Sequence, residues 1–276
     1  MRTSLRHDSA TDDGMVIREA SDGYILIAQT AHAWIAGQLA QAWGNATFGE
    51  LSPRRDVCLA AELHDIGWLD WELAPTWNPT TGRPYTFLDL PRREHIAIWS
   101  KAAHWLRPQS AYAALLTSLH GTGLYSRYDG AADTEEEKAI VRAFLMRQRA
   151  LQTSIREELR ADPQWAPYSS DEAIERNRRL IAVWDWISLL LCFRVTRERA
   201  INDVPTRCDR TTLRLTPVAA DEETVVVSPW PFRCEEVVVA CDGRFLTTTF
   251  ETEAAMRAAI EAAPRVHLRI RLVRRG

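Results

Sequence analysis

Hydrophobic positions recur at helical spacing over most of the chain. From Met15 to about Pro205, apolar residues fall at steps of three and four, the spacing that lines up one face of an α-helix. The stripe over residues 25–43 carries His32 among its apolar positions. Further helices are expected over residues 52–67, 94–107, 111–120, 134–160 and 171–193.

Residues with strong local preferences mark the ends of two of these helices. Ser52 is a suitable N-cap, and Gly67 can supply the left-handed residue that stops a helix. Thr134 and Glu137 have the spacing of a capping box. Between these helices, residues 70–94 are rich in Pro, Gly and aromatic side chains. We expect them to form a packed functional loop.

Beyond about Val204 the period of the pattern changes to two, which is typical of strands. Asp242 and Gly243 have the composition of a hairpin turn, and one helix is expected over residues 251–263. The predicted fold is therefore mainly α, with a polar flexible tail over residues 1–14, a helical domain over 15–205 and a small β-rich appendage over 206–276. Strands are expected over residues 211–218, 223–233, 235–250 and 266–275.

Composition narrows the classes of partner. The net charge is −3 at pH 7, without the basic excess that a nucleic-acid binder needs. The apolar runs are far shorter than the roughly 20 residues that cross a bilayer. Five cysteines without C-x-x-C spacing favour a reducing compartment. We expect a cytoplasmic protein, a monomer or a homo-oligomer, that acts on a small molecule and has no nucleic-acid or membrane partner.

Histidine and aspartate supply the candidate chemistry. His64 and Asp65 are adjacent at the end of a predicted helix, where the negative end of the helix dipole attracts a cation. Asp185 lies between two tryptophans in an apolar helix, and a buried carboxylate needs a cation, a set of donors or a metal ion. A core hydrogen bond would explain His32 taken alone. A hydrogen-bonded polar core and a metal site are the two interpretations of this set.

The order of these residues resembles the HD-domain superfamily of metal-dependent phosphohydrolases, over about residues 20–195. That resemblance implies an HD-domain-like helical bundle that holds two divalent transition-metal ions, and imidazoles with carboxylates suit Fe, Mn, Zn, Co or Ni. His104, nine residues after His95, would lie on the opposite side of a continuous helix, away from the site. The resemblance assigns one ion to His32, His64, Asp65 and Asp185, and the other to Asp65, His95 and His120.

The substrate-binding residues of that superfamily are matched only in part. Many members carry a lysine three residues after the HD aspartate, whereas this chain has a tryptophan there. Nearby arginines would restore a positive charge for a phosphate, and aromatic residues after the HD pair would form the wall of a pocket. The candidates for substrate binding are Arg92, Arg93, Arg127, Trp68 and Tyr85.

The resemblance implies hydrolysis of phosphate esters by a hydroxide that bridges two metal ions, with Asp65 as the bridging, catalytic carboxylate. A second branch of the superfamily uses the same ligands for a mixed-valent di-iron centre that oxidises a small polyol or phosphonate. A non-catalytic metal- or ligand-binding module is the third alternative. The run HDIGWLDWE, followed by TGRP, also looks like an uncharacterised bacterial family of HD-fold proteins with no assigned substrate.

Overall fold

The computed structural model describes residues 15–275 except 88, 127–129, 131–132 and 220. The expected tail over 1–14 and the candidate Arg127 lie outside the described residues. The helices of the described chain are α1 (Gln29–Ala42), α2 (Arg54–Glu62), α3 (Leu69–Leu73), α4 (Arg92–Leu106), α5 (Ala111–Ser126), α6 (Glu135–Ala161), α7 (Asp171–Phe193) and α8 (Glu253–Ala262).

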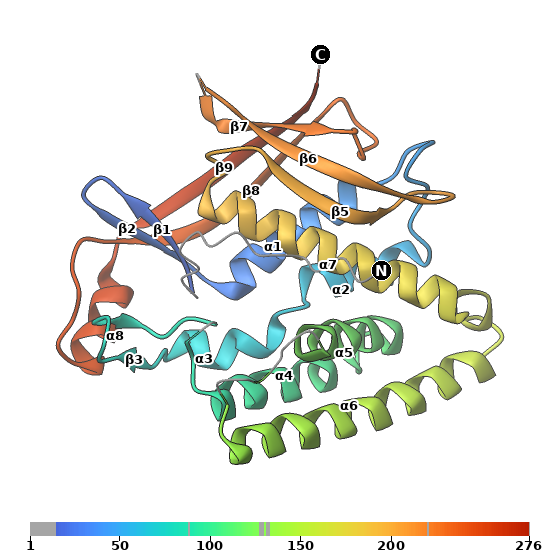
Figure 1. Ribbon diagram of the computed structural model, residues 1–276, viewed down its shortest axis with the longest axis horizontal. Coiled ribbons are helices and arrows are strands. Elements are labelled where there is room, and N and C mark those ends of the chain that lie inside the picture. The colour runs from blue at the N-terminus through green and yellow to red at the C-terminus, as the bar shows by residue number, and fades with distance from the viewer. Residues whose placement is uncertain (1–14, 88, 127–129, 131–132, 220, 276) are drawn as a thin grey trace.

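A seven-stranded sheet covers one side of these helices (Figure 1). The strand order is β1-β2-β8-β9-β7-β6-β5. Neighbouring strands are antiparallel except for the parallel pair β7 and β9. A short hairpin forms a second sheet from β3 (Trp77–Asn78) and β4 (Arg83–Pro84). The strands of the large sheet are β1 (Val16–Ala20), β2 (Gly23–Ile27), β5 (Arg199–Pro205), β6 (Arg210–Val218), β7 (Asp221–Ser228), β8 (Glu236–Leu246) and β9 (Arg265–Arg274).

The prediction of a mainly α, all-helical bundle with a small β appendage is wrong, because the large sheet makes this an α+β fold. The sheet recruits β1 and β2 from the start of the chain, where a helical pattern was predicted. In β2 the residues 24–27 are all buried, so they lack the alternation that identifies a half-exposed strand. The predicted boundary at residue 205 falls within the sheet, at the end of β5.

The predicted hairpin turn at Asp242 and Gly243 is also wrong. Both residues lie inside β8, which continues to Leu246 in register with β9. A Cβ atom on Gly243 would lie 2.6 Å from Cγ2 of Ile25 in β2. The glycine therefore permits the close approach of β8 to β2. Besides forming turns, glycine commonly has this role in a sheet.

Local signals at helix ends were right in one case and wrong in another. Thr134 and Glu137 form the predicted capping box at the start of α6. By contrast, α2 begins after Pro53, without a side-chain cap, and ends at Glu62. Gly67 lies in a 3₁₀ turn after α2, where a Cβ atom would be 2.4 Å from the carbonyl oxygen of Ile98. Its role is to let that turn pack against α4.

The core joins the helices to the sheet. Trp43 at the end of α1 is fully buried, and its ring packs edge-on against Trp184 of α7 and Phe232, with centroids 5.6 Å away in each case. α1 and α7 lie under the sheet, and α4, α5 and α6 lie on their far side (Figure 1). Among the helices of the described residues, none is long and apolar enough to cross a membrane.

Candidate metal centre

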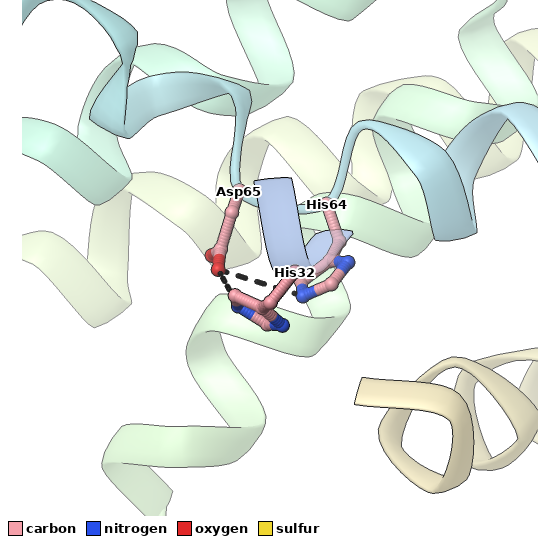
Figure 2. A group of neighbouring side chains, drawn as sticks. All are labelled: His32, His64 and Asp65. Atoms are coloured by element: carbon pink, nitrogen blue, oxygen red, sulfur yellow. Dashed lines mark hydrogen bonds and ion pairs between the residues drawn. The ribbon is translucent and has the colours of Figure 1, made fainter. Parts of the chain in front are cut away.

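Five of the six predicted metal ligands converge between the helices. His32 comes from the first turn of α1, and His64 with Asp65 from the turn that follows α2. His120 comes from α5 and Asp185 from α7. The side chains of His32, His64 and Asp65 point toward one another (Figure 2). Because four separate segments supply the five side chains, only the folded chain brings them together.

The donor atoms of these residues lie close together. Nε2 of His32 is 2.7 Å from Oδ2 of Asp65. Nε2 of His64 is 3.4 Å from Oδ1 of Asp185 and 3.6 Å from Oδ2 of Asp65. Nε2 of His120 is 3.5 Å from Oδ2 of Asp185. The five residues form two overlapping donor groups, each with its atoms within 4.8 Å of one another: His32, His64 and Asp65, and His64, His120 and Asp185.

The environment of His64 fits a metal ligand. The side chain is fully buried, and Nδ1 donates a hydrogen bond to the carbonyl oxygen of Ala61 at 2.8 Å. Nε2 faces the carboxylates of Asp65 and Asp185 at 3.6 and 3.4 Å and makes no hydrogen bond, so it can offer its lone pair to an ion once its proton is displaced. A buried polar atom of this kind is costly unless a cation satisfies it. Ring nitrogens that bind metals commonly have this arrangement, with the other nitrogen held by a backbone carbonyl.

The charges of the group also attract a cation. Burial alone would lower the pKa of His64, but the carboxylates of Asp65 and Asp185 outweigh burial and raise that pKa to about 9. Burial acts to raise the pKa of Asp185, yet the nearby imidazoles of His64 and His120 hold it well below its usual range. Two carboxylates within a buried cluster of imidazoles therefore stabilise a positive charge between them, whether a proton or a metal ion.

A hydrogen bond from outside the cluster orients His32. The hydroxyl of Ser188 donates to the carbonyl oxygen of Asp185 at 2.8 Å. Its oxygen is then the acceptor for Nδ1–H of His32, at 2.9 Å. Nδ1 is thereby used outside the cluster, and Nε2, which donates to Oδ2 of Asp65 at 2.7 Å, is the ring nitrogen that a metal ion could take in place of its proton.

His95, the sixth predicted ligand, lies apart from the other five. It belongs to neither donor group of the described residues. Its Nδ1 is hydrogen-bonded to the hydroxyl of Tyr125, and its Nε2 accepts from the indole N–H of Trp99 at 3.3 Å. Burial lowers the pKa of His95 to about 4; the charge of Arg92 adds to this and that of Asp65 opposes it. The ring is therefore neutral near pH 7. His104 is exposed on the same helix, as expected.

A cavity of about 260 Å³ opens onto the cluster. It contains two of the predicted substrate-binding residues, Arg92 and Trp68. The other two described candidates do not line it: Arg93 is exposed and paired with Glu136, and Tyr85 packs behind the cavity wall. The residues that line it are Gln29, His32, Asp65, Trp68, Phe87, Arg92, His95, Trp99, His120, Leu124, Tyr125, Asp185 and Leu189.

Several of these lining residues were missed in the sequence. Phe87 lies in the loop over residues 70–94, which was expected to be functional, so its composition was a usable signal. Tyr125 and Leu124 follow His120 on α5, and Leu189 follows Asp185 by one turn of α7. Leu124 and Leu189 each follow a predicted ligand by four residues, and this helical spacing was the signal that could have placed them at the same face, whereas Tyr125, five residues after His120, lacks that spacing.

Comparison with known proteins identifies the family. The model of a family described as a protein of unknown function, DUF3891, matches residues 15–248. The chain belongs to this family. The match spans β1 to β8 and therefore contains all five clustered donors and the cavity. No curated protein and no solved structure matches the chain.

Proposed function

We propose that this DUF3891 protein is a metal-dependent phosphohydrolase that acts on a small phosphorylated molecule. The observation that carries the proposal is the buried Nε2 of His64, which makes no hydrogen bond and faces two carboxylates beside a cavity that also contains Arg92. His32, His64, Asp65, His120 and Asp185 would hold the metal. A divalent ion bound there would polarise a phosphoryl oxygen and make a water molecule more acidic.

The walls of the cavity combine a cationic group for the phosphate with apolar side chains around it. Arg92 supplies a guanidinium, the group best suited to grip phosphoryl oxygens. Its ion pair with Asp133, at 3.5 Å, holds the side chain at this wall. Bulk water must also be excluded from the reacting group, and apolar side chains in the cavity wall do this. These are Trp68, Phe87, Trp99, Leu124 and Leu189.

The test is phosphate release that depends on metal. Protein stripped with a chelator and reloaded with Mn²⁺, Co²⁺, Fe²⁺ or Zn²⁺ is assayed against a panel of phosphomonoesters and nucleotides, with O₂ uptake followed in the same samples. We expect phosphate release that falls to background in Asp65→Asn, whose side chain keeps its shape but loses the charge that attracts the ion. His104→Gln, on an exposed face of α4, is the matched control and should retain full activity.

Two results would contradict the proposal. Uptake of O₂ without phosphate release would assign the site to an oxidation. Metal binding without phosphate release or O₂ uptake, across the whole panel, would identify the chain as a non-catalytic metal- or ligand-binding module.

A further inference from the structure

The donor cluster and His95 line one cavity, but His95 belongs to neither donor group, and both of its ring nitrogens are hydrogen-bonded to side chains outside the cluster. We infer that the centre holds a single metal ion, bound by His32, His64, Asp65, His120 and Asp185, and that His95 lines the substrate cavity without binding metal. This rests on the metal site of the proposed function. It departs from the pair of ions that the HD-domain resemblance implies.

The two donor groups cannot serve two ions. Both use Nε2 of His64, and a neutral imidazole nitrogen has one lone pair to give. The second nitrogen of that ring is committed to the carbonyl oxygen of Ala61. The groups are therefore two descriptions of one site, with three imidazoles and two carboxylates around it.

A second ion would need His95, and the ring of His95 is already committed. The indole N–H of Trp99 can only donate, so Nε2 of His95 is its acceptor at 3.3 Å. Nδ1 must then carry the proton in the neutral ring, and it donates to the hydroxyl oxygen of Tyr125. Turning Nε2 to a metal would leave the N–H of Trp99, a residue only 5% exposed, without this acceptor, at a cost in the folded state.

The charge of Arg92 beside His95 also opposes a second cation. Arg92 precedes His95 by three residues on α4 and lines the same cavity. A guanidinium repels a nearby divalent cation and attracts an anion. The space beside His95 and Arg92 is therefore suited to the anionic group of the substrate. The ring of His95 packs there against Trp68, with centroids 5.4 Å apart.

The experiment counts ions. Chelator-treated full-length protein is titrated with Mn²⁺, freed of excess metal and measured for bound metal by mass spectrometry and electron paramagnetic resonance. We expect one Mn²⁺ per chain, with the hyperfine pattern of an isolated ion. Replacing His95 by Gln should preserve that count, because Gln can accept from Trp99 and donate to Tyr125. Replacing His64 by Gln should lower the Mn²⁺ affinity by more than the roughly 10–100-fold loss typical of an outer hydrogen-bond partner.

The outcomes separate this inference from the proposed function. Two ions per chain, or the spectrum of a coupled pair, would overturn the inference even if phosphate is released. Loss of metal in His95→Gln, with His104→Gln unchanged, would overturn it as well. No ion in the wild-type protein would overturn both. One ion without phosphate release would leave the inference standing, remove the proposed function and exclude a di-iron centre.

Discussion

Single residues outside the donor cluster hold it in a metal-binding form. Ser188 accepts from Nδ1 of His32 and thereby keeps Nε2 available for the cluster. We predict that Ser188→Ala weakens Mn²⁺ binding about 10–100-fold, the usual cost of losing an outer partner of a metal-bound histidine. Titration with Mn²⁺ measures this directly. Ser100→Ala is the matched control, because the hydroxyl of Ser100 also bonds a carbonyl within its own helix but lies away from the cavity lining. Equal affinities in the two variants would refute the role of Ser188.

At this scale the sequence predicts residue types better than their partners. Five of the six expected ligands meet because each lies on the inner side of its segment, which spacing and local composition reveal. The partners of His95 could not be read in the same way. Trp99 is one turn further along α4, but Tyr125 comes from another helix, and their contact exists only after α4 and α5 pack together.

At the scale of elements, the loop after the HD pair fixes the start of α1. That helix has no capping side chain of its own, since Ala28 stands at the N-cap. The carboxylate of Glu72, on α3, takes this place by accepting from the backbone N–H of Gln29 and from the hydroxyl of Thr30, the latter at 2.7 Å. One turn of the same helix then delivers His32 to the metal centre. The predicted function of the loop over residues 70–94 is thus partly structural.

We predict that Glu72→Ala lowers the free energy of unfolding by about 0.5–2 kcal/mol, the range measured for loss of an N-cap. Glu72→Gln should cost less, because its amide oxygen still accepts from the N-terminus of α1. Urea denaturation followed by circular dichroism gives both values. Glu157→Ala, on the long helix α6, serves as a comparison at another glutamate. A larger loss in Glu72→Gln than in Glu72→Ala would contradict this capping role.

We predict that the contribution of Glu72 to the free energy of unfolding depends on pH. Burial raises the pKa of Glu72, although the hydrogen bonds from Thr30 and Gln29 oppose the shift. The folded state therefore binds the proton more tightly than the unfolded state, and the stabilisation by protonated Glu72 is complete below the unfolded pKa. It is lost as the pH rises from the ordinary glutamate value of about 4.5 through the raised folded value. The difference in unfolding free energy between wild type and Glu72→Gln should follow that window. A difference independent of pH would show that this carboxyl is not shifted.

Helices were easier to predict than strands for a physical reason. A helix such as α6 is specified by contacts within its own residues, including the capping box at Thr134. Strand β1 pairs with β2, and β2 pairs in turn with β8, whose residues come more than two hundred positions later. Gly243 shows the same limit: its neighbours along the chain suggest a turn, and its neighbour in space, Ile25, explains it.

At the scale of the whole molecule, the sheet and the helices share one core. Arg18 of β1 donates to the carbonyl oxygens of Leu191 and Cys192 at the end of α7. The side chain of Gln38 on α1 pairs with both backbone groups of Ala240 in β8, at 2.8 and 2.9 Å. The helices that carry His32 and Asp185 are therefore held by the sheet as well as by each other.

This shared core predicts one unfolding transition for the whole chain. Ending the chain at residue 205 would remove β6 to β9, uncover the buried ring of Trp43 where Phe232 packs, and leave Gln38 without its partners in β8. Exposure of that much apolar surface is incompatible with a stable fold of the helical part. We expect far-ultraviolet circular dichroism and tryptophan fluorescence of the full chain to melt together. The fragment 15–205 should show no cooperative melt and bind no Mn²⁺, and co-expression with 206–276 should restore both. A fragment that melts cooperatively and binds the ion alone would instead establish the helical part as an independent domain, with the sheet as an accessory.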